Sequence, residues 1–600
     1  MSGLEEPEEL APEQGSLRLA SPDDTATVAD WERASAAVLR RARRLREDEP
    51  DSLVWERLAR TTLDGIVVPP IGQPADLEGR TTSGRPTRAG AWDVRTQLEV
   101  TDARAANEAA LVDLENGATS LMLHLDGHEP PHWVTLLDGV LLDLAPVTLD
   151  RPTTEQSESF LGFLEQHDGS VHPATSPGFD PATLEMLPSP VRDDGRGSQD
   201  VLLPLVRRAV RLGVRALVVD GTALHDQGAS DGQELGWTMA VGISYLRVLV
   251  EAGLSVGEAA RLLEFRYAVT DEQLPAIAKL RAARRLWARV LEASGGDDVP
   301  QAQHAVTSRP MTSRHDPWVN MLRTTVAAFA AGVGGADAVT VVPFDERLGV
   351  PDAFGRRIAR NTSSLLIEES HLAVVADPAG GSYAVERLTD DLAVAGWAEL
   401  GRIEADGGAE SDEARQMMKQ RVRAVAATRD VQVAHRTRPI TGLSEFPHLG
   451  ETLPERSGTV SRYARAYGWA YEDLRARPAS APVLLATMGT VAQHTARATF
   501  ASNLLAAGGV AVEPAGPTGG VEDVVAAYDG QAVVCLAGND RAYAEWGADL
   551  VAALREAGAS YVVLAGRPGE SGLTDDTVDD WAAVGVDALA FLTRVREALG

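Results

Sequence analysis

Three histidines at four-residue intervals are a set of side chains whose types and spacing could do chemistry together. His124, His128 and His132 would line one face of a helix, and imidazole nitrogens in such a row are common zinc ligands. A glycine and two consecutive prolines lie between them, and proline breaks the interior of a helix. We therefore predict that this segment is a polar loop after a strand, and that the chain holds no metal.

The chain has one cysteine, Cys535, within the apolar run AVVCLAG. A lone cysteine in such a run is typical of a buried strand, because the thiol packs as a small apolar group. One cysteine allows no disulfide within the chain, which fits a reducing compartment. We predict a structural role for this thiol and a cytoplasmic location for the protein.

Polar residues that follow apolar runs mark further candidates in the stretch from Pro343 to Glu386. The run Ala338–Val342 ends at a proline and an acidic pair, and the run Leu372–Val375 ends at Asp377. A segment of helical apolar spacing follows each run. This order predicts strand, loop, helix, strand, loop, helix, with polar side chains at the sheet edge where α/β folds bind ligands.

The same alternation over residues 51–425 predicts the elements that position these side chains. Expected strands include Ala118–Leu125, Gly139–Val147 and Val214–Val219, and expected helices include Thr25–Arg44, Thr101–Asn116 and the basic segment Leu274–Glu292. Strands and helices alternate at spacings that fit βα units. The pattern predicts an α/β protein with a parallel (β/α)8 TIM barrel.

A second domain follows a connector, residues 426–480, that lacks a regular apolar period. From residue 481 five apolar runs alternate with helical segments: VLLAT, VAVEP, AVVCLAG, SYVVLAG and VDALAFL. Read as five strands, they predict a flavodoxin-like doubly wound domain over residues 481–600. Residues 1–50 precede the barrel, and residues 1 to about 25 are acidic and proline-containing, which predicts an extended or disordered arm.

Composition restricts the class of function. The net charge of −31 over 600 residues argues against a nucleic-acid or anionic-membrane surface. The N-terminus MSGLEEPEEL lacks the apolar core of a signal peptide, and no apolar run reaches the roughly 18 residues that a membrane span needs. We predict a multi-domain protein with neither nucleic acid nor membrane as a partner.

Several phrases of the chain are similar to those of one enzyme family. They are RIARNT (Arg357–Thr362), EES (Glu368–Ser370), DPAGGSYAVE-LT (Asp377–Thr389) and KLRAARRLWAR (Lys279–Arg289). In these phrases the chain resembles the adenosylcobalamin-dependent acyl-CoA mutases, above all methylmalonyl-CoA mutase. The resemblance covers about residues 30–600 and implies an acyl-CoA barrel followed by a cobalamin-binding-type domain.

The barrel departs from the family's pattern at its substrate contacts. The segment PTRAGAWDVRTQ lacks the tyrosine that stacks in the family's active site; Trp92, Arg95 and Gln97 remain, and we interpret them as anchors of a loop. The T-x-Q-N-D phrase and the arginine that grips the substrate carboxylate are missing from about residues 152–197. His225 stands at the position of the family's active-site histidine with changed neighbours, and we interpret it as vestigial.

The loop that would hold cobalamin departs further. In the family it reads D-x-H-x-x-G, where the histidine ligates cobalt, the aspartate orients the histidine and the glycine admits the nucleotide tail. Aligned on Gly489, these three positions hold Val491, Gln493 and Ala496, and His494 comes one residue late. The resemblance therefore implies that this chain binds no cobalamin.

A kept fold with lost sites is similar to the small subunit of two-subunit mutases, as is the phrase TGLSEFP (Thr441–Pro447). The resemblance implies a heterodimer with a large catalytic subunit, which binds adenosylcobalamin and interconverts (R)-methylmalonyl-CoA and succinyl-CoA by a radical mechanism. This chain would support that partner, contact it with its N-terminal arm, and hold neither a catalytic residue nor a cofactor. Two alternatives stay open: a catalytically active cobalamin-dependent mutase for another acyl-CoA, and a free-standing CoA-ester-binding protein.

Overall fold

The computed structural model of the chain describes residues 25–600 except for 81–83, 126, 128, 188–198, 298, 459–463, 568–572 and 575. The chain divides into two compact units, Met1–Gly72 and Gln73–Gly600. The expected N-terminal arm, residues 1 to about 25, lies almost wholly outside the described residues.

The first unit contains a pair of helices and a short antiparallel hairpin. Its elements are α1 (Val28–Arg41), α2 (Val54–Leu58), β1 (Arg60–Thr61) and β2 (Val67–Val68). The side chain of Thr27 accepts a hydrogen bond from the Asp30 N–H and so caps α1. The rings of Trp31 and Trp55 pack with their centroids 4.6 Å apart. The helix predicted within Thr25–Arg44 is confirmed.

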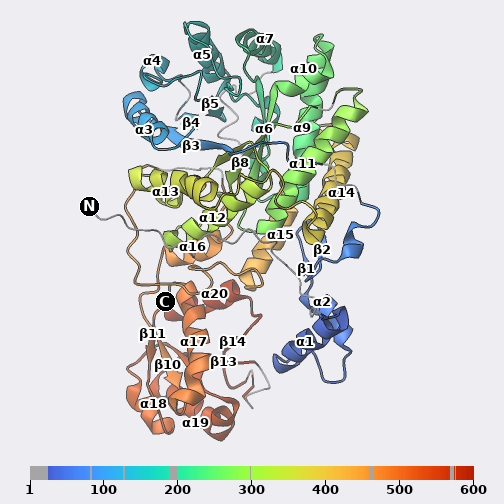
Figure 1. Cartoon of the computed structure of the whole chain (residues 1–600). Helices are drawn as coiled ribbons and strands as arrows, with labels where there is room; N and C mark the ends of the chain where they lie inside the picture. The colour runs from blue at the N-terminus through green and yellow to red at the C-terminus, as the bar shows by residue number, and fades with distance from the viewer. Residues whose placement is uncertain are drawn as a thin grey trace, which may run out of the picture. The chain divides into compact units, whose positions relative to one another are not determined.

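A parallel sheet of seven strands lies within residues 93–340 of the large unit (Figure 1). The strands are β3 (Asp93–Val100), β4 (Ser120–Leu125), β5 (Val147–Asp150), β6 (Leu217–Asp220), β7 (Leu263–Val269), β8 (Gln303–Thr307) and β9 (Ala338–Thr340). Their order in the sheet is β5-β4-β3-β9-β8-β7-β6. β3, the first of these strands along the chain, therefore pairs with β9, the last, and the sheet curls. Most strand residues are buried, as expected for parallel strands covered on both faces.

The segment Ser176–Phe179 links the two edge strands of this sheet. Ser176 forms a parallel bridge with β5, and Phe179 forms one with β6. The Leu149 N–H donates to the Ser176 carbonyl at 3.2 Å, and the Val218 N–H donates to the Phe179 carbonyl at 3.1 Å. The predicted α/β architecture is therefore present, and its parallel sheet of seven strands is curled.

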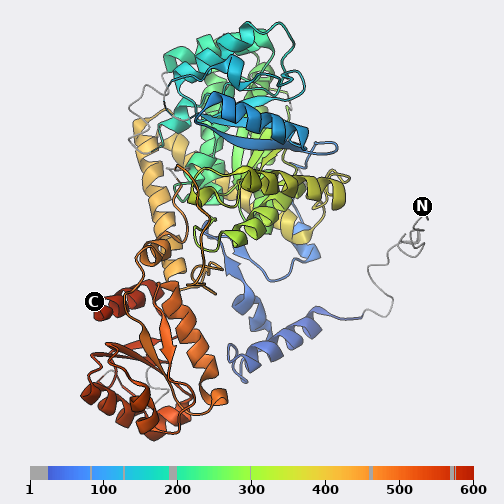
Figure 2. The same ribbon diagram turned by 90° about the vertical axis from the view of Figure 1, so that its left-hand side faces the viewer.

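Helices follow the strands and pack around the sheet or on one another (Figures 1 and 2). They are α3 (Ala103–Glu115), α4 (Trp133–Leu136), α5 (Thr154–Glu165), α6 (Pro181–Leu184), α7 (Leu202–Leu212), α8 (Thr222–His225), α9 (Asp231–Glu251), α10 (Val256–Arg261), α11 (Gln273–Ala293), α12 (Pro317–Val333), α13 (Ala353–Ser364), α14 (Tyr383–Ala405), α15 (Asp412–Ala434) and α16 (Trp469–Arg475). Helix α11 is the predicted basic helix, but Lys279 and Arg281 are buried. Lys279 Nζ lies 2.8 Å from Glu234 of α9, and Arg281 lies 2.7 Å from Glu386 of α14. The basic residues thus join three neighbouring helices.

The C-terminal part has a parallel five-stranded sheet with helices between its strands. Its elements are β10 (Val483–Thr487), α17 (Val491–Ala507), β11 (Val512–Pro514), α18 (Val521–Ala527), β12 (Val533–Ala537), α19 (Asp540–Ala557), β13 (Tyr561–Ala565), β14 (Asp580–Ala582) and α20 (Ala588–Leu599). The strand order is β11-β10-β12-β13-β14, or 2-1-3-4-5 along the domain, an order of doubly wound open sheets. Cys535 lies buried in β12, as predicted.

The predicted fifth strand of this sheet, VDALAFL, is wrong. This run begins helix α20, and β14 provides the fifth strand. The Asp587 side chain accepts from the Ala590 N–H at 3.0 Å and caps the helix. Phe591, Leu592 and Val595 are buried at helical spacing. An apolar run as short as the one after Asp587 fits a buried strand and a buried helix equally well.

Two expected strands of the barrel are also wrong. Only the last residue of Gly139–Val147 belongs to a strand, because the rest forms turns before β5. The run Leu372–Val375 contains no strand: the backbone of His371 takes a left-handed φ of 53°, and the chain turns. Val374 is 79 % exposed, so this run does not enter the core.

Candidate functional site

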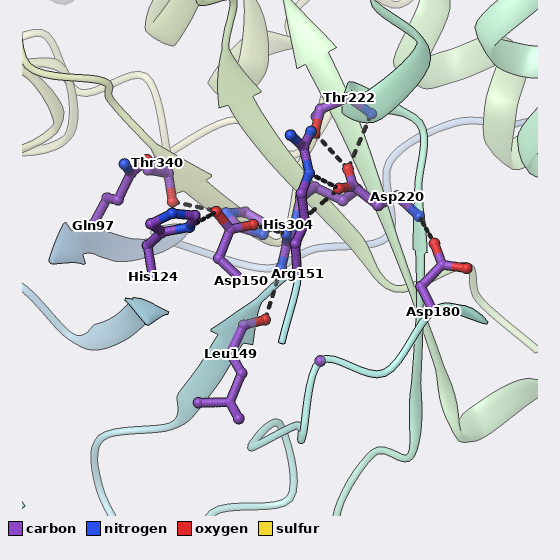
Figure 3. A network of polar contacts seen from close by, with 12 residues as sticks. Gln97, His124, Leu149, Asp150, Arg151, Asp180, Asp220, Thr222, His304 and Thr340 are labelled. Atoms are coloured by element: carbon purple, nitrogen blue, oxygen red, sulfur yellow. Dashed lines mark hydrogen bonds and ion pairs between the residues drawn. The ribbon is translucent and has the colours of Figure 1, made fainter. Parts of the chain in front are cut away.

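The strands of the curled sheet carry a cluster of polar side chains toward their carboxyl ends, which we call the mouth network. Figure 3 shows part of it, with Gln97, His124, Asp150, Arg151 and Asp220 labelled. Its members are Gln97 and Glu99 of β3, His124 of β4, Asp150 and Arg151 at the end of β5, Asp220 and Asp226 after or at the end of β6, Arg266 of β7, Arg309 after β8 and Glu346 after β9. In parallel α/β sheets the carboxyl edge is where catalytic and binding groups gather.

Arg151 is the centre of one half of the network. Its backbone has a left-handed φ of 48°, which is uncommon for a residue with a side chain. Its Nε donates to Asp220 Oδ2 at 2.8 Å, and a terminal nitrogen donates to Asp226 Oδ2 at 3.0 Å. Burial lowers the pKa of the guanidinium, but the two carboxylates outweigh burial and raise that pKa above its ordinary value. The positive charge of Arg151 is therefore balanced by carboxylates of this chain.

Asp150 connects two other members of the network. Its Oδ1 accepts from Arg266 at 2.5 Å, and its Oδ2 lies 3.2 Å from His124 Nδ1. Burial favours the protonated acid, but the hydrogen bond with His124 and the charges of Arg266 and Arg151 hold the pKa of Asp150 well below its usual range. For His124, burial alone would lower the pKa. The hydrogen bond with Asp150 and the charge of Glu99 outweigh burial and raise the pKa of His124 above its ordinary value.

Arg309 is the centre of a third group of contacts in the mouth network. One terminal nitrogen donates to Gln97 Oε1 at 2.8 Å, and its Nε donates to Glu346 Oε1 at 3.2 Å. Burial raises the pKa of Glu346 to about 7 despite the charge of Arg309. All three arginines, Arg151, Arg266 and Arg309, thus have carboxylate partners inside the barrel.

One cavity beside this network is small. The cavity between Arg151, Asp180, Asp220 and Arg266 measures about 10 Å³. A water molecule needs about 10 to 15 Å³ on this measure. The cavity therefore has room for about one water and not for an acyl group.

His225 ends α8 at the same edge of the barrel. Its Nε2 lies 2.7 Å from Ser308 Oγ and 3.3 Å from Tyr467 Oη. Its Nδ1 lies 3.7 Å from Glu234 Oε2. Burial and the nearby charge of Lys279 hold the pKa of His225 well below its ordinary value, so the imidazole is neutral at pH 7. The histidine has hydrogen-bond partners of its own, as a structural residue would.

The interpretation of Arg95 and Gln97 as loop anchors is wrong, whereas Trp92 does lie in a loop and donates from Nε1 to Ser363 Oγ at 3.3 Å. Arg95 and Gln97 lie on strand β3 and are buried, and Trp92 is buried immediately before it. Arg95 donates to Glu264 Oε1 of β7 at 2.9 Å. Polar residues alternate with apolar ones here because one face of β3 meets the charged interior of the barrel. Sequence reasoning took that polarity for a loop.

The side chains aligned with a cobalt-binding loop belong to helix α17. Val491 and Ala496 are exposed on this helix. Gln493 Oε1 accepts from the Thr490 N–H at 2.7 Å, which caps the helix start. The only histidine of residues 481–600, His494, is buried, and its Nδ1 lies 3.2 Å from the Gly489 carbonyl. A helix replaces the loop from Val491 onward.

The histidine row does not form a unit on one helix. His124 lies on β4, His132 caps the short helix α4 with its ring nitrogen, and His128 lies outside the described residues. Across the ranges that the structure describes, no three His, Cys, Asp or Glu side chains are grouped to hold a metal. No helix in the same ranges is long and apolar enough to cross a membrane.

Comparison with known proteins gives the family. The family model described as methylmalonyl-CoA mutase matches residues 209–475. A protein of Streptomyces virginiae named methylmalonyl-CoA mutase small subunit is 42 % identical, over 98 % of this chain and 99 % of its own length. This chain belongs to the methylmalonyl-CoA mutase family. Similar relatives include a probable methylmalonyl-CoA mutase small subunit of Mycobacterium tuberculosis, 38 % identical over 95 % of this chain and 97 % of that protein. Another is the methylmalonyl-CoA mutase small subunit of Propionibacterium freudenreichii subsp. shermanii, 34 % identical over 98 % and 97 %.

The resemblance implies adenosylcobalamin as the family's cofactor, and the residues of this mutase-family chain do not fit it. Gln493 cannot ligate cobalt as an imidazole would, and its carbonyl oxygen serves the helix cap. His494 points a ring nitrogen at the Gly489 carbonyl and is buried beside it. The cobalt-ligating arrangement is therefore missing from the α17 start.

Proposed function

We propose that this chain is the non-catalytic small subunit of a heterodimeric methylmalonyl-CoA mutase of the cytoplasm. Its partner would be a large catalytic subunit that binds adenosylcobalamin and interconverts (R)-methylmalonyl-CoA and succinyl-CoA. Relatives that align over nearly the whole chain carry the name small subunit, which supports this assignment.

The proposal includes the finer form of the fold. Counting Ser176–Phe179 as an eighth strand makes the curled sheet a closed (β/α)8 barrel. The second sheet would then be a flavodoxin-like domain of cobalamin-binding type without its cofactor. In this proposal the chain keeps both folds because the partner packs on their surfaces, and not because it reacts within them.

The mouth network is the observation that carries the non-catalytic role. An acyl-CoA ester is anionic. Its reacting group must enter a space that offers a cation without a carboxylate partner, or free hydrogen-bond donors. Here Arg151, Arg266 and Arg309 are neutralised by Asp220, Asp150 and other internal acceptors. The adjacent cavity of about 10 Å³ admits no substrate group.

Co-expression with a large subunit tests the proposal. We expect a one-to-one complex by size-exclusion chromatography with light scattering. After the chains are separated, adenosylcobalamin added to each should change its absorption spectrum only with the large subunit. A complex that fails to form, or a cobalamin spectrum with the chain described here, would overturn the assignment.

One observation favours the alternative of an active mutase for another acyl-CoA. His225 remains at the barrel mouth, 3.7 Å from Glu234, as a general acid or base could. That reading requires turnover by the isolated chain with cobalamin and an acyl-CoA. The same separated chain, assayed for loss of an acyl-CoA, decides between the two.

A further inference from the structure

A short strap from the connector lies over the mouth of the barrel. We define the strap as residues Arg465–Tyr467. The Arg465 N–H donates to the carbonyl of Asp226, after β6, at 2.9 Å. The Tyr467 N–H donates to the carbonyl of Pro310, after β8, at 2.8 Å. The strap is therefore bound by its backbone to two loops of the carboxyl edge.

The Tyr467 side chain enters the site that the strap covers. Its hydroxyl oxygen lies 3.3 Å from His225 Nε2, which in turn lies 2.7 Å from Ser308 Oγ. The rings of Tyr467 and His225 meet edge-on, with centroids 6.3 Å apart. The phenol thus has a polar partner at its tip, as a bound ligand has in a built pocket.

Two arginines cover the aromatic ring. The guanidinium carbons of Arg429 and Arg438 lie 4.6 Å and 5.4 Å from the ring centroid of Tyr467, within the range of cation–π attraction. Arg429 donates to the carbonyls of Gly228 and Ala229, and Arg438 pairs with Glu272 at 2.6 Å. Loops of the barrel therefore hold the arginines in place over the ring.

We propose that Tyr467 is a built-in occupant of the barrel mouth, filling with the chain's own phenol the position that an outside ligand would take. This inference rests on the proposed function, because it names the residue that keeps the barrel of the supporting subunit closed. The pocket around the ring would accept a small phenol if the side chain were removed.

The experiment uses the full chain in complex with its large subunit. Tyr467→Gly deletes the side chain, and p-cresol, which has the shape of that side chain, is the probe. We expect the variant complex to bind p-cresol by isothermal titration calorimetry and to melt at a higher temperature with it. The wild-type complex should do neither. Toluene, which cannot bond to His225, should bind the variant about five to ten times more weakly than p-cresol.

Several results would overturn the inference. A folded Tyr467→Gly complex that ignores p-cresol up to its solubility limit is one, and a wild-type complex that binds p-cresol at the same site is another. If the glycine variant fails to fold, nitration of the wild-type tyrosines by tetranitromethane decides. Tyr383 is 40 % exposed and should be nitrated at least tenfold faster than Tyr467. Equal nitration rates would show that the strap does not close the mouth.

Failure of this inference is separable from failure of the proposed function. Complex formation and turnover of wild-type protein report on the subunit role and do not involve p-cresol. If the wild-type complex forms and the variant does not bind p-cresol, only the role of Tyr467 falls. If no complex forms, the subunit role falls, and p-cresol binding by the isolated Tyr467→Gly chain still tests the strap.

Discussion

Arg151 Nε donates a hydrogen bond to Asp220 Oδ2 at 2.8 Å, across 69 positions of the chain. The contact joins the ends of β5 and β6, which are separated in the sheet by the segment Ser176–Phe179. The left-handed backbone of Arg151 persists because this ion pair and the bond to Asp226 fix its side chain.

Arg151→Ala should destabilise the barrel by about 3 to 5 kcal/mol. The change removes the main cation from two buried carboxylates, Asp220 and Asp226, and leaving such charges unpaired costs that amount. Scanning calorimetry of the full chain should show the barrel transition at a lower temperature. Arg208→Ala is the control: it breaks a pair with Glu165 at the surface and should cost less than about 1 kcal/mol. Equal shifts for the two variants would contradict this account of the network.

Glu346 should make the fold less stable as pH rises. Burial raises the folded-state pKa of this carboxyl to about 7, above the ordinary 4.5, and its Oε2 has no hydrogen-bond partner among the described residues. The folded state therefore holds a proton that the unfolded state has released. Its contribution is full below about pH 4.5 and is lost as pH rises through about 7.

Glu346→Gln tests this sign. The amide keeps the shape of the side chain without the charge. As pH rises from about 5 to about 8, the free energy of unfolding of the variant should therefore fall by roughly 1 to 3 kcal/mol less than that of wild type. Melting temperatures across that range are the measurement. Glu165→Gln is the control: the hydrogen bond and charge of Arg208 lower the pKa of Glu165 below its ordinary 4.5, so this carboxyl is ionised in both states above about pH 5 and the pH dependence of this variant should match that of wild type there. Parallel melting curves for wild type and Glu346→Gln would refute the prediction.

In the proposed heterodimer with a large subunit, Gln493→Ala and His494→Ala should leave mutase turnover unchanged. Neither side chain is placed to hold cobalt, since one caps α17 and the other lies against the Gly489 carbonyl. Gln493→Ala should lower stability by about 0.5 to 1 kcal/mol through the lost cap. Steady-state assay and cobalamin titration of each variant complex are the measurements. A tenfold loss of turnover in His494→Ala with an unchanged melting temperature would show that the residue takes part in cofactor binding.

Cys535 should resist thiol reagents in the native protein. The side chain is 1 % exposed on β12, and burial raises the pKa of its thiol to about 12. Thiolate, the reactive form, is then scarce and inaccessible at pH 8. Dithionitrobenzoate should release one equivalent of coloured product in denaturant and almost none without it. Rapid release from the native chain would show that β12 opens readily.

Periodicity and capping predicted much of the fold from the sequence. The helix predicted over Thr101–Asn116 is confirmed as α3, which Asp102 caps, and four of the five predicted C-terminal strands are present. The run VDALAFL was read as a strand because a short apolar segment contains no period to distinguish it from a helix. Its capping residue, Asp587, was the signal that could have identified α20.

The mouth network could not be read from sequence in the same way. Arg151 and Asp220 each follow a short apolar strand, so their place at a sheet edge could have been inferred. Their pairing could not, because contacts over so many positions leave no local pattern. The locations of Arg95 and Gln97 are mispredicted for a related reason. Their hydrogen-bond partners come from other parts of the chain, which a single segment does not show.

The curled sheet is made of two well-paired sectors with narrow joints between them. β3 shares six residue pairs with β4 but only two with β9, and the other joint consists of the single bridges at Ser176 and Phe179. Arg151, Arg266 and Arg309 each reach from one sector to the other. Transient local opening of the sheet would separate the two sectors at these joints. Amide protons at the joints would therefore exchange before those of β4 and β7. The ionic groups at the mouth thus act as cross-links that hold the two sectors together, and salt or acid that weakens them should loosen the joints first.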